Sequence, residues 1–365
     1  EDASDKFVPQ LHQTVGWLVE LRPQLFGEVS EREPALILGL EIDLDYRQRF
    51  KLVAALLDGV KTRKLHIPRL GSILDSSNLK HPEIGNQLRP YLIDEKEDFF
   101  ARRTAMDLAI TTAASDLSDE LACIALNKDE RYGLRSHAAW AISRIGSTEA
   151  RLALKELAID SLSDDPDDQL KGYALAAVWP EHISSVDLFR VLTPPKRRSV
   201  FGGYYGFLIR DICEHLTAEH LVDALDWVQK QGRQEERNHA FEELIGNLLQ
   251  FAWENTEHPG VLDQLALTLL KRSADHQPVM GKSIDKQSVN PFESNHIARR
   301  KLILAMLQNS CWTDNSTYGL VVQEPQIVLP NDLDWILANI QSSTSSDERA
   351  RWADILAWLR HRLNT

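Results

Sequence analysis

The sequence predicts an all-α fold built as an α-solenoid of stacked helical hairpins, and a repeated helix pattern is the main reason. In each repeat a basic residue is followed three positions later by Ala, and small or aliphatic residues come three and four positions after that. The pattern occurs at Arg102–Ala109, Arg135–Ile142 and Lys171–Val178. Helix pairs repeated at such intervals bury their apolar faces on one another, so they form a stack without a single closed core. Such a stack favours a binding surface over a catalytic pocket.

Composition supports a soluble, folded chain: 43% of the 365 residues are apolar and 26% are charged. The net charge of −13 argues against a nucleic-acid partner, because that affinity needs clustered cations. No run of about 18 uncharged apolar residues is present, so we expect no membrane span.

Cysteine usage predicts a reducing compartment. Cys123, Cys213 and Cys311 lie far apart in apolar, helical contexts, which indicates buried thiols and neither disulfides nor zinc. Without a recognisable signal peptide, we expect a cytoplasmic protein. The chain starts at Glu1 without Met, which suggests a piece of a longer protein.

The N-terminal part, 1–78, is predicted to be a helical junction that does not follow the repeat. Helices are expected at 8–22 and 46–64, the second capped by Asp43 or Asp45.

Regular repeats are predicted for 79–178 and irregular ones for 179–365, which together form the solenoid domain. The regular pairs join 83–92 to 99–113, 118–126 to 131–145 and 148–162 to 168–178. Two long loops, 276–292 and 313–330, interrupt the irregular part. Because Tyr318–Val322 is strand-like, a short β-hairpin near 318–329 is the one expected exception to the helical fold.

Acids six positions before the bases predict a charge ladder between repeats. We expect each acid to cap a helix and each base to reach the acid of the adjacent repeat. Exposed rungs would contribute about 0–1 kcal/mol each, so packing of Ala and aliphatic residues should dominate stability. The alternative is that these charges are simply solvated. The pairs are Asp129 with Arg135, Asp165 with Lys171, and Glu293 with Arg299.

This pattern resembles HEAT repeats, whose second helix carries an Asp followed by a Val-Arg or Leu-Lys pair. Asp129 with Leu134-Arg135, and Asp165 with Leu170-Lys171, match it. The resemblance implies a right-handed superhelix of hairpins. The repeat near Arg102 departs from it, with Lys96 where the acid belongs, and 218–253 matches poorly.

A narrower resemblance covers most of the chain. Several phrases are similar to the region that follows the nucleotide-binding module in bacterial STAND-type NTPases of the NACHT class. They are Pro23–Leu38, Arg47–Asp58, Lys80–Tyr91, Gln169–Pro180, Leu192–Arg198, Leu329–Leu337 and Arg351–Leu356.

In that family this region is an α-helical sensor, with the NTPase and an effector upstream, and such proteins often act in defence against phage. The resemblance therefore implies a protein trigger, phage-derived, and an upstream NACHT module in the full-length chain. It transfers no ATPase activity, because the NTPase motifs are absent here. Gly281-Lys282-Ser283 ends like a phosphate-binding loop, but His276 stands where the first glycine is required.

The best candidate contact for a protein partner is the segment 194–206. It carries three cations and two tyrosines between stiffening prolines and flexible glycines, and Tyr and Arg are enriched in binding hot spots. The alternative is that the aromatics fold back onto the helices. The candidate residues are Lys196, Arg197, Arg198, Tyr204 and Tyr205.

No catalytic residue, metal site or cofactor is predicted. The acidic stretch 160–168 lacks the glycine and distal Glu of a calcium loop, and His215 and His220 have the wrong spacing for the His-Glu-x-x-His zinc motif. The first hypothesis is thus a non-enzymatic sensor. The alternative is a free-standing HEAT scaffold that bridges partners. An enzyme such as a HEAT-like DNA glycosylase or a lyase is disfavoured by the acidic charge and the lack of an evident site.

Overall fold

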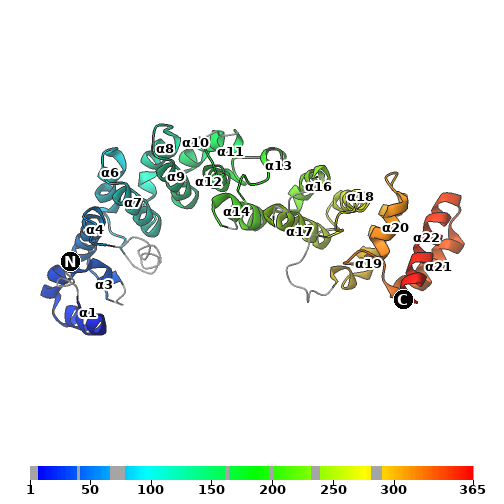
Figure 1. The fold of residues 1–365 in the computed structure, drawn as a ribbon, viewed down its shortest axis with the longest axis horizontal. Helices are drawn as coiled ribbons and strands as arrows, with labels where there is room; N and C mark the ends of the chain where they lie inside the picture. The colour runs from blue at the N-terminus through cyan, green and yellow to red at the C-terminus, as the bar shows by residue number, and fades with distance from the viewer. Residues whose placement is uncertain are drawn as a thin grey trace. The chain divides into compact units, whose positions relative to one another are not determined.

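The computed structural model describes residues 7–38, 42–65, 79–160, 164–197, 201–231, 239–280 and 290–364. All regular elements in these ranges are helical, as Figure 1 shows, so the all-α prediction is confirmed there. Contacts divide the chain into a first unit, Glu1–Val178, and a second unit, Trp179–Thr365. None of the described helices is long and apolar enough to cross a membrane.

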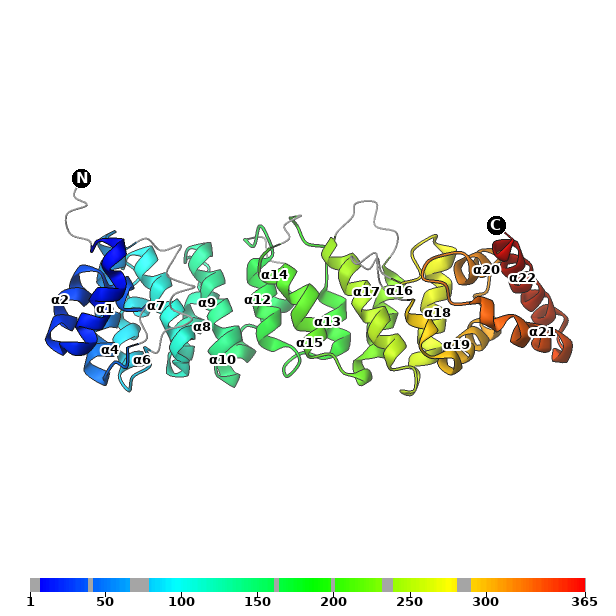
Figure 2. The same cartoon turned by 90° about the horizontal axis from the view of Figure 1, so that it is seen from below.

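The first unit consists of consecutive helices that pack in pairs. Within a pair, α6 packs on α7 and α8 on α9, while α10 and α11 pack on α12. Between pairs, α4 contacts α7, α7 contacts α9 and α9 contacts α12; Figures 1 and 2 both show α7 beside α9. The helices are α1 (His12–Leu21), α2 (Phe26–Arg32), α3 (Pro34–Leu38), α4 (Tyr46–Lys61), α6 (Ile84–Ile93), α7 (Phe99–Thr112), α8 (Ser118–Leu126), α9 (Tyr132–Ile145), α10 (Thr148–Ala153), α11 (Lys155–Ile159) and α12 (Gln169–Val178).

The repeated alanines lie where the sequence places them, in the helices that pair with the next repeat. They are fully buried in α7, α9 and α12, and their small side chains let these helices approach closely. They are Ala105, Ala109, Ala138, Ala141, Ala174 and Ala177.

Two predicted helix starts are set by side-chain caps. The Asp45 carboxylate accepts from the Gln48 N–H at 2.8 Å, and the Gln48 side chain accepts from the Asp45 N–H at 2.9 Å, a reciprocal capping box for α4. Ser147 Oγ accepts from the Ala150 N–H at 3.2 Å and caps α10. Asp45, not Asp43, is thus the cap of α4.

The second unit is also a series of packed helices. One row runs through α13, α16, α18, α20 and α22, each contacting the next; α17 contacts α16 and α18, α19 contacts α18 and α22, and α21 packs on α22. The elements are α13 (Ser185–Val191), α14 (Gly203–Gly206), a π-helical turn η6 (Phe207–Asp211), α15 (Ile212–Glu214), α16 (Leu221–Lys230), α17 (His239–Glu254), α18 (Val261–Ala274), α19 (His296–Gln308), α20 (Asp314–Val321), α21 (Leu333–Ser342) and α22 (Ser346–Leu363).

The expected hairpin near 318–329 is wrong, because Tyr318–Val321 forms the end of α20. Ser316, Thr317, Leu320 and Val321 are buried, which is a helical spacing and not the alternation of a strand. The Thr313 N–H donates to Ser316 Oγ at 2.9 Å at the helix start. Burial between α18 and α22 has overridden the β-propensity of this run.

Gly319 allows α20 to lie against α18. A Cβ at this position would lie 2.0 Å from Ser273 Oγ and 2.6 Å from Ser273 Cβ. The close approach of the two helices therefore requires glycine here.

We predict that Gly319→Ala lowers the free energy of unfolding by about 1–3 kcal/mol, the usual effect of forcing extra volume into a packed contact. Gly27→Ala is the control, because a Cβ there meets nothing within 4 Å. Thermal unfolding of both variants checks this, and equal shifts would contradict the packing argument.

Candidate functional site

Three buried arginines connect neighbouring helix pairs, and we call Arg102, Arg135 and Arg299 the rung arginines. Each is the fourth residue of its helix, in α7, α9 and α19 respectively. Each donates to a main-chain carbonyl of the segment before its helix and to an acid in a turn 28 to 33 residues further along the chain. One side chain thus ties three segments together.

In the first unit the rungs run from α7 to the turn before α9 and from α9 to the loop before α12. Arg102 donates to Glu130 Oε2 at 2.6 Å and to the Leu92 carbonyl at the end of α6. Arg135 pairs with Asp164 and donates to the Ala125 carbonyl at the end of α8 at 3.2 Å. A cation is favourable at these helix ends, where unpaired carbonyls carry partial negative charge.

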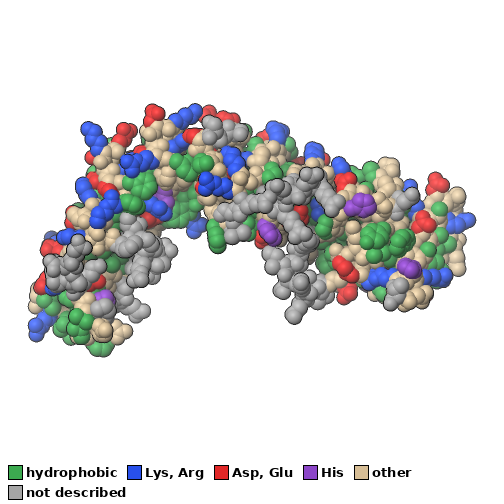
Figure 3. Space-filling model, in the orientation of Figure 1, with side chains coloured by type: hydrophobic (Ala, Val, Ile, Leu, Met, Phe, Trp, Pro, Cys, Tyr) green, Lys and Arg blue, Asp and Glu red, His purple; other side chains and the backbone are tan. Residues whose placement is uncertain are grey.

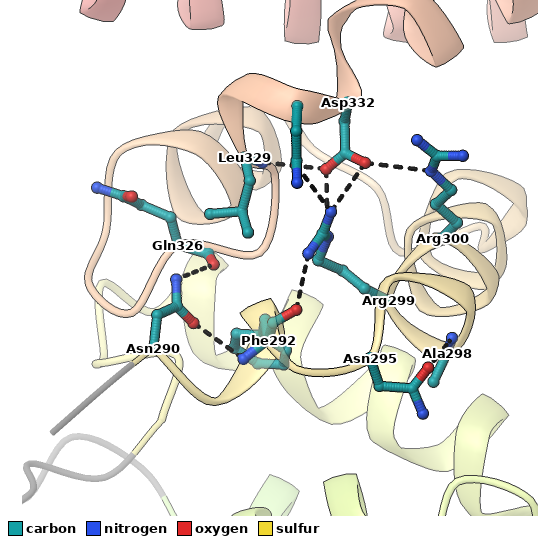
Figure 4. A network of polar contacts seen from close by, with 10 residues as sticks. Asn290, Phe292, Asn295, Ala298, Arg299, Arg300, Gln326, Leu329 and Asp332 are labelled. Atoms are coloured by element: carbon teal, nitrogen blue, oxygen red, sulfur yellow. Dashed lines mark hydrogen bonds and ion pairs between the residues drawn. The ribbon is translucent and has the colours of Figure 1, made fainter.

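In the second unit Arg299 and Asp332 form a fully buried ion pair, drawn in Figure 4. Arg299 Nε and Nη2 lie 3.2 and 3.0 Å from the two Asp332 oxygens, and Nη1 lies 2.8 Å from the Phe292 carbonyl. Asp332 also accepts from Arg300 Nε at 3.2 Å and from the Leu329 N–H at 3.1 Å. The buried carboxylate is therefore surrounded by donors.

Of the acids expected in the ladder, Asp165 caps a helix as expected, but none of the three meets a rung arginine. Asp165 is buried, accepts from the Leu170 and Lys171 N–H groups at the start of α12, and receives the Tyr132 hydroxyl of α9 at 2.7 Å. Lys171 itself is also buried. Asp129 and Glu293 are exposed. The acids that meet the rung arginines are instead Glu130, Asp164 and Asp332, 28 to 33 residues further along the chain.

The Tyr132 hydroxyl links α9 to the loop before α12. Burial, followed by its hydrogen bonds to Asp167 and Asp165, raises the pKa of its hydroxyl above the usual value. The hydroxyl thus stays protonated and acts as a donor across the contact between α9 and α12.

The predicted contact segment 194–206 is split between surface and interior. Tyr204 is buried, and its hydroxyl exchanges hydrogen bonds with the Thr193 carbonyl at 2.7 Å and the Thr193 N–H at 3.0 Å. It packs into the fold and is not open to a partner. Tyr205 is half-buried, and its hydroxyl lies 3.5 Å from Glu243 Oε2. Lys196 and Arg197 are exposed, and Arg198 lies outside the described residues. Phe201, which the sequence analysis missed, is 79% exposed.

The first unit contains a groove that the sequence analysis did not find. It has a volume of about 500 Å³ and lies at the start of α7, and we call it the aromatic–basic groove. It is lined by Arg63, Lys96, Glu97, Asp98, Phe99, Phe100 and Arg131. The signal in the sequence was the run Lys96–Phe100, which places charges and two aromatics in the turn before a repeat helix.

Two perpendicular phenyl rings carry the guanidinium groups of this groove. The Phe99 and Phe100 centroids lie 5.2 Å apart at an interplanar angle of 88°. Arg63 lies 4.5 Å from the Phe100 centroid and Arg131 lies 5.8 Å from that of Phe99, both within cation–π range. The rings thereby hold two flexible cations in place.

The acids of the groove have partners within the protein. Asp98 pairs with Arg63 at 2.8 Å and caps α7 through the Phe100 and Ala101 N–H groups. Glu97 pairs with Lys61 at 3.0 Å. Lys96 and Arg131 are exposed and form no ion pair with other described residues. Figure 3 shows cationic side chains (blue) among apolar ones (green) on the face of this unit turned to the viewer.

A second groove of about 400 Å³ lies between α6 and α8 and includes Arg102, Glu120, Cys123 and Glu130. Cys123 and Cys311 are exposed, so the expectation of three buried thiols is wrong for these two. In the described part of the chain, no group of three or more His, Cys, Asp or Glu side chains is placed to hold a metal ion.

Comparisons of the chain with protein-family models, curated proteins and solved structures gave no match.

We predict that Arg299→Met lowers the free energy of unfolding of the second unit by about 3–5 kcal/mol, because it leaves the Asp332 carboxylate buried without its main partner. Urea denaturation measures this. Arg190→Met is the control: its pair with Asp187 is exposed and should contribute about 0–1 kcal/mol. The double variant Arg299→Met/Asp332→Leu should regain most of the loss, and a loss as small as that of the control would refute the role of the rung.

The Arg135 rung should give a pH signature. The hydrogen bond that Arg135 donates to Asp164 holds the pKa of Asp164 below the ordinary 3.8. The rung thus adds stability above about pH 3.8, and this contribution disappears as pH falls through the lower, folded-state pKa. Thermal unfolding from pH 7 to 2 should show Asp164→Asn less stable than the parent at pH 7 and equal to it at the acid end. A pH-independent difference would contradict this.

Proposed function

We propose that the chain is a non-enzymatic recognition module with a HEAT-like α-solenoid architecture. The rung arginines carry this proposal: the same contact, from the fourth residue of one helix to an acid in a turn 28 to 33 residues further on, recurs in both units. Repetition of one contact is what a stack of equivalent hairpins requires. Such stacks expose the turns and helix faces of every repeat, which suits them to binding proteins.

We further propose that the module is the sensor of a NACHT-type STAND NTPase and that its trigger is a phage protein. The phrases that resemble this family support the assignment, and they include the helix α12 with its buried Lys171. The exposed part of 194–206, with Lys196, Arg197 and Phe201, is one candidate contact for the trigger. The aromatic–basic groove is another.

A sensor works only through differential affinity. To move a two-state switch from 1:99 to 99:1, the trigger must bind the active state about 10⁴-fold more tightly, or about 5.5 kcal/mol. Binding that is equal in both states would leave the upstream module unchanged.

We predict that the genomic reading frame upstream of Glu1 encodes a Gly-x-x-x-x-Gly-Lys-Ser/Thr loop. Expressed in full, this protein should protect bacteria against at least one phage, and phage escape mutations should map to one protein that binds the isolated chain in calorimetry.

The control is the full-length protein with its phosphate-loop Lys changed to Ala, which should still bind the trigger and lose protection. A reading frame that starts just before Glu1 would refute the sensor and favour the free-standing scaffold. Binding of the chain to damaged DNA, with release of a base, would favour the enzyme instead.

A further inference from the structure

The aromatic–basic groove joins two phenyl rings to two cations, Lys96 and Arg131, that form no ion pair with the described residues. The net charge of the chain is −13, yet the groove has three cations against two acids. Both acids are engaged, Asp98 by Arg63 and α7, and Glu97 by Lys61. Lys96 and Arg131 are left to face solvent, one on each of two successive turns.

The groove is built so that Arg131 keeps its position. The Arg131 guanidinium lies over the Phe99 ring, and the main-chain N–H of Arg131 donates to Glu130 Oε1 at 2.8 Å. Glu130 Oε2 in turn receives Arg102, whose side chain is 3% exposed. The buried rung thus positions the turn that carries Arg131. A guanidinium stacked on a ring keeps its N–H edge free for a planar anion such as a carboxylate.

We propose that this groove binds an acidic segment of a protein partner, with a side-chain carboxylate between Lys96 and Arg131 and a neighbouring apolar side chain against Phe99 and Phe100. The volume of about 500 Å³ accommodates a few side chains. This inference names the chemistry of the trigger and so rests on the proposed function.

The charge pattern favours a protein over a nucleic acid. Binding of a phosphate backbone needs a continuous row of cations. Here Glu97 and Asp98 lie among the cations, and two positions rather than a row face solvent.

The test uses a fluorescein-labelled dodecapeptide of three Glu-Leu-Glu-Phe repeats, and fluorescence anisotropy measures its Kd for the full chain. The matched peptide carries Gln for every Glu, and labelled single-stranded dT12 is the nucleic-acid competitor. We expect the acidic peptide to bind, the Gln peptide to bind at least about tenfold more weakly, and affinity to fall with added salt.

The variant Lys96→Gln/Arg131→Gln should weaken the acidic peptide at least about tenfold. The control Arg47→Gln/Lys51→Gln removes the same charge from two exposed positions near the start of α4 and should leave the Kd within about twofold. Equal binding of the two peptides, no binding at 1 mM, or no effect of the groove variant would overturn the proposal. Tighter binding of dT12 than of the peptide would replace it with a nucleic-acid site.

Failure here is separable from failure of the sensor proposal. If a phage trigger binds the Lys96→Gln/Arg131→Gln variant with unchanged affinity, the groove proposal alone is refuted. An upstream frame without an NTPase, together with peptide binding, refutes the sensor alone.

Discussion

The arrangement of this chain depends on buried guanidinium groups that join one helix pair to the next. Apolar burial between α7, α9 and α12 supplies most of the favourable free energy, but it is not directional. Alanine and leucine surfaces allow neighbouring helices to slide, whereas a guanidinium fixed to a helix-end carbonyl and to an acid allows one spacing. The rungs therefore set the register of pairs that the hydrophobic contacts hold together.

Burial explains why these contacts specify structure more than they add stability. Arg299 and Asp332 are both fully buried, and removing two charges from water costs about as much as their attraction returns. The cost is tolerable because Asp332 accepts from Arg299, Arg300 and the Leu329 N–H, so that neither oxygen lacks a donor. A misplaced turn would leave the same groups buried without partners, which makes alternative spacings of the helix pairs unfavourable in free energy. Arg272 shows a milder form of this cost: burial lowers its pKa to about 10.

The sequence predicted what depends on local pattern and missed what depends on distant partners. Helix periodicity and caps placed α7, α8 and α9 within a residue or two. The sequence did not identify the rung acids, because each lies about 30 residues beyond its arginine. Acidic residues such as Asp129 also lie next to them in the same turns. The Tyr204 hydroxyl bonds the main chain of Thr193, 11 residues earlier, and no local rule identifies that partner. The sequence predicted a hairpin in place of α20, because only the tertiary structure shows that the β-branched residues of this helix pack between α18 and α22.

One turn of the first unit both fixes the spacing of two helix pairs and lines the aromatic–basic groove. Glu130 completes the rung from Arg102, and the next residue, Arg131, lines the aromatic–basic groove. Lys96 lies on the preceding turn. The affinity of a ligand that bridges Lys96 and Arg131 would therefore depend on the spacing between two successive helix pairs. Such a ligand would bind more tightly to one spacing than to another, and that difference is the only quantity that can shift a conformational equilibrium. A groove between repeats can thereby turn binding into a change of register, which a groove within one rigid pair cannot do.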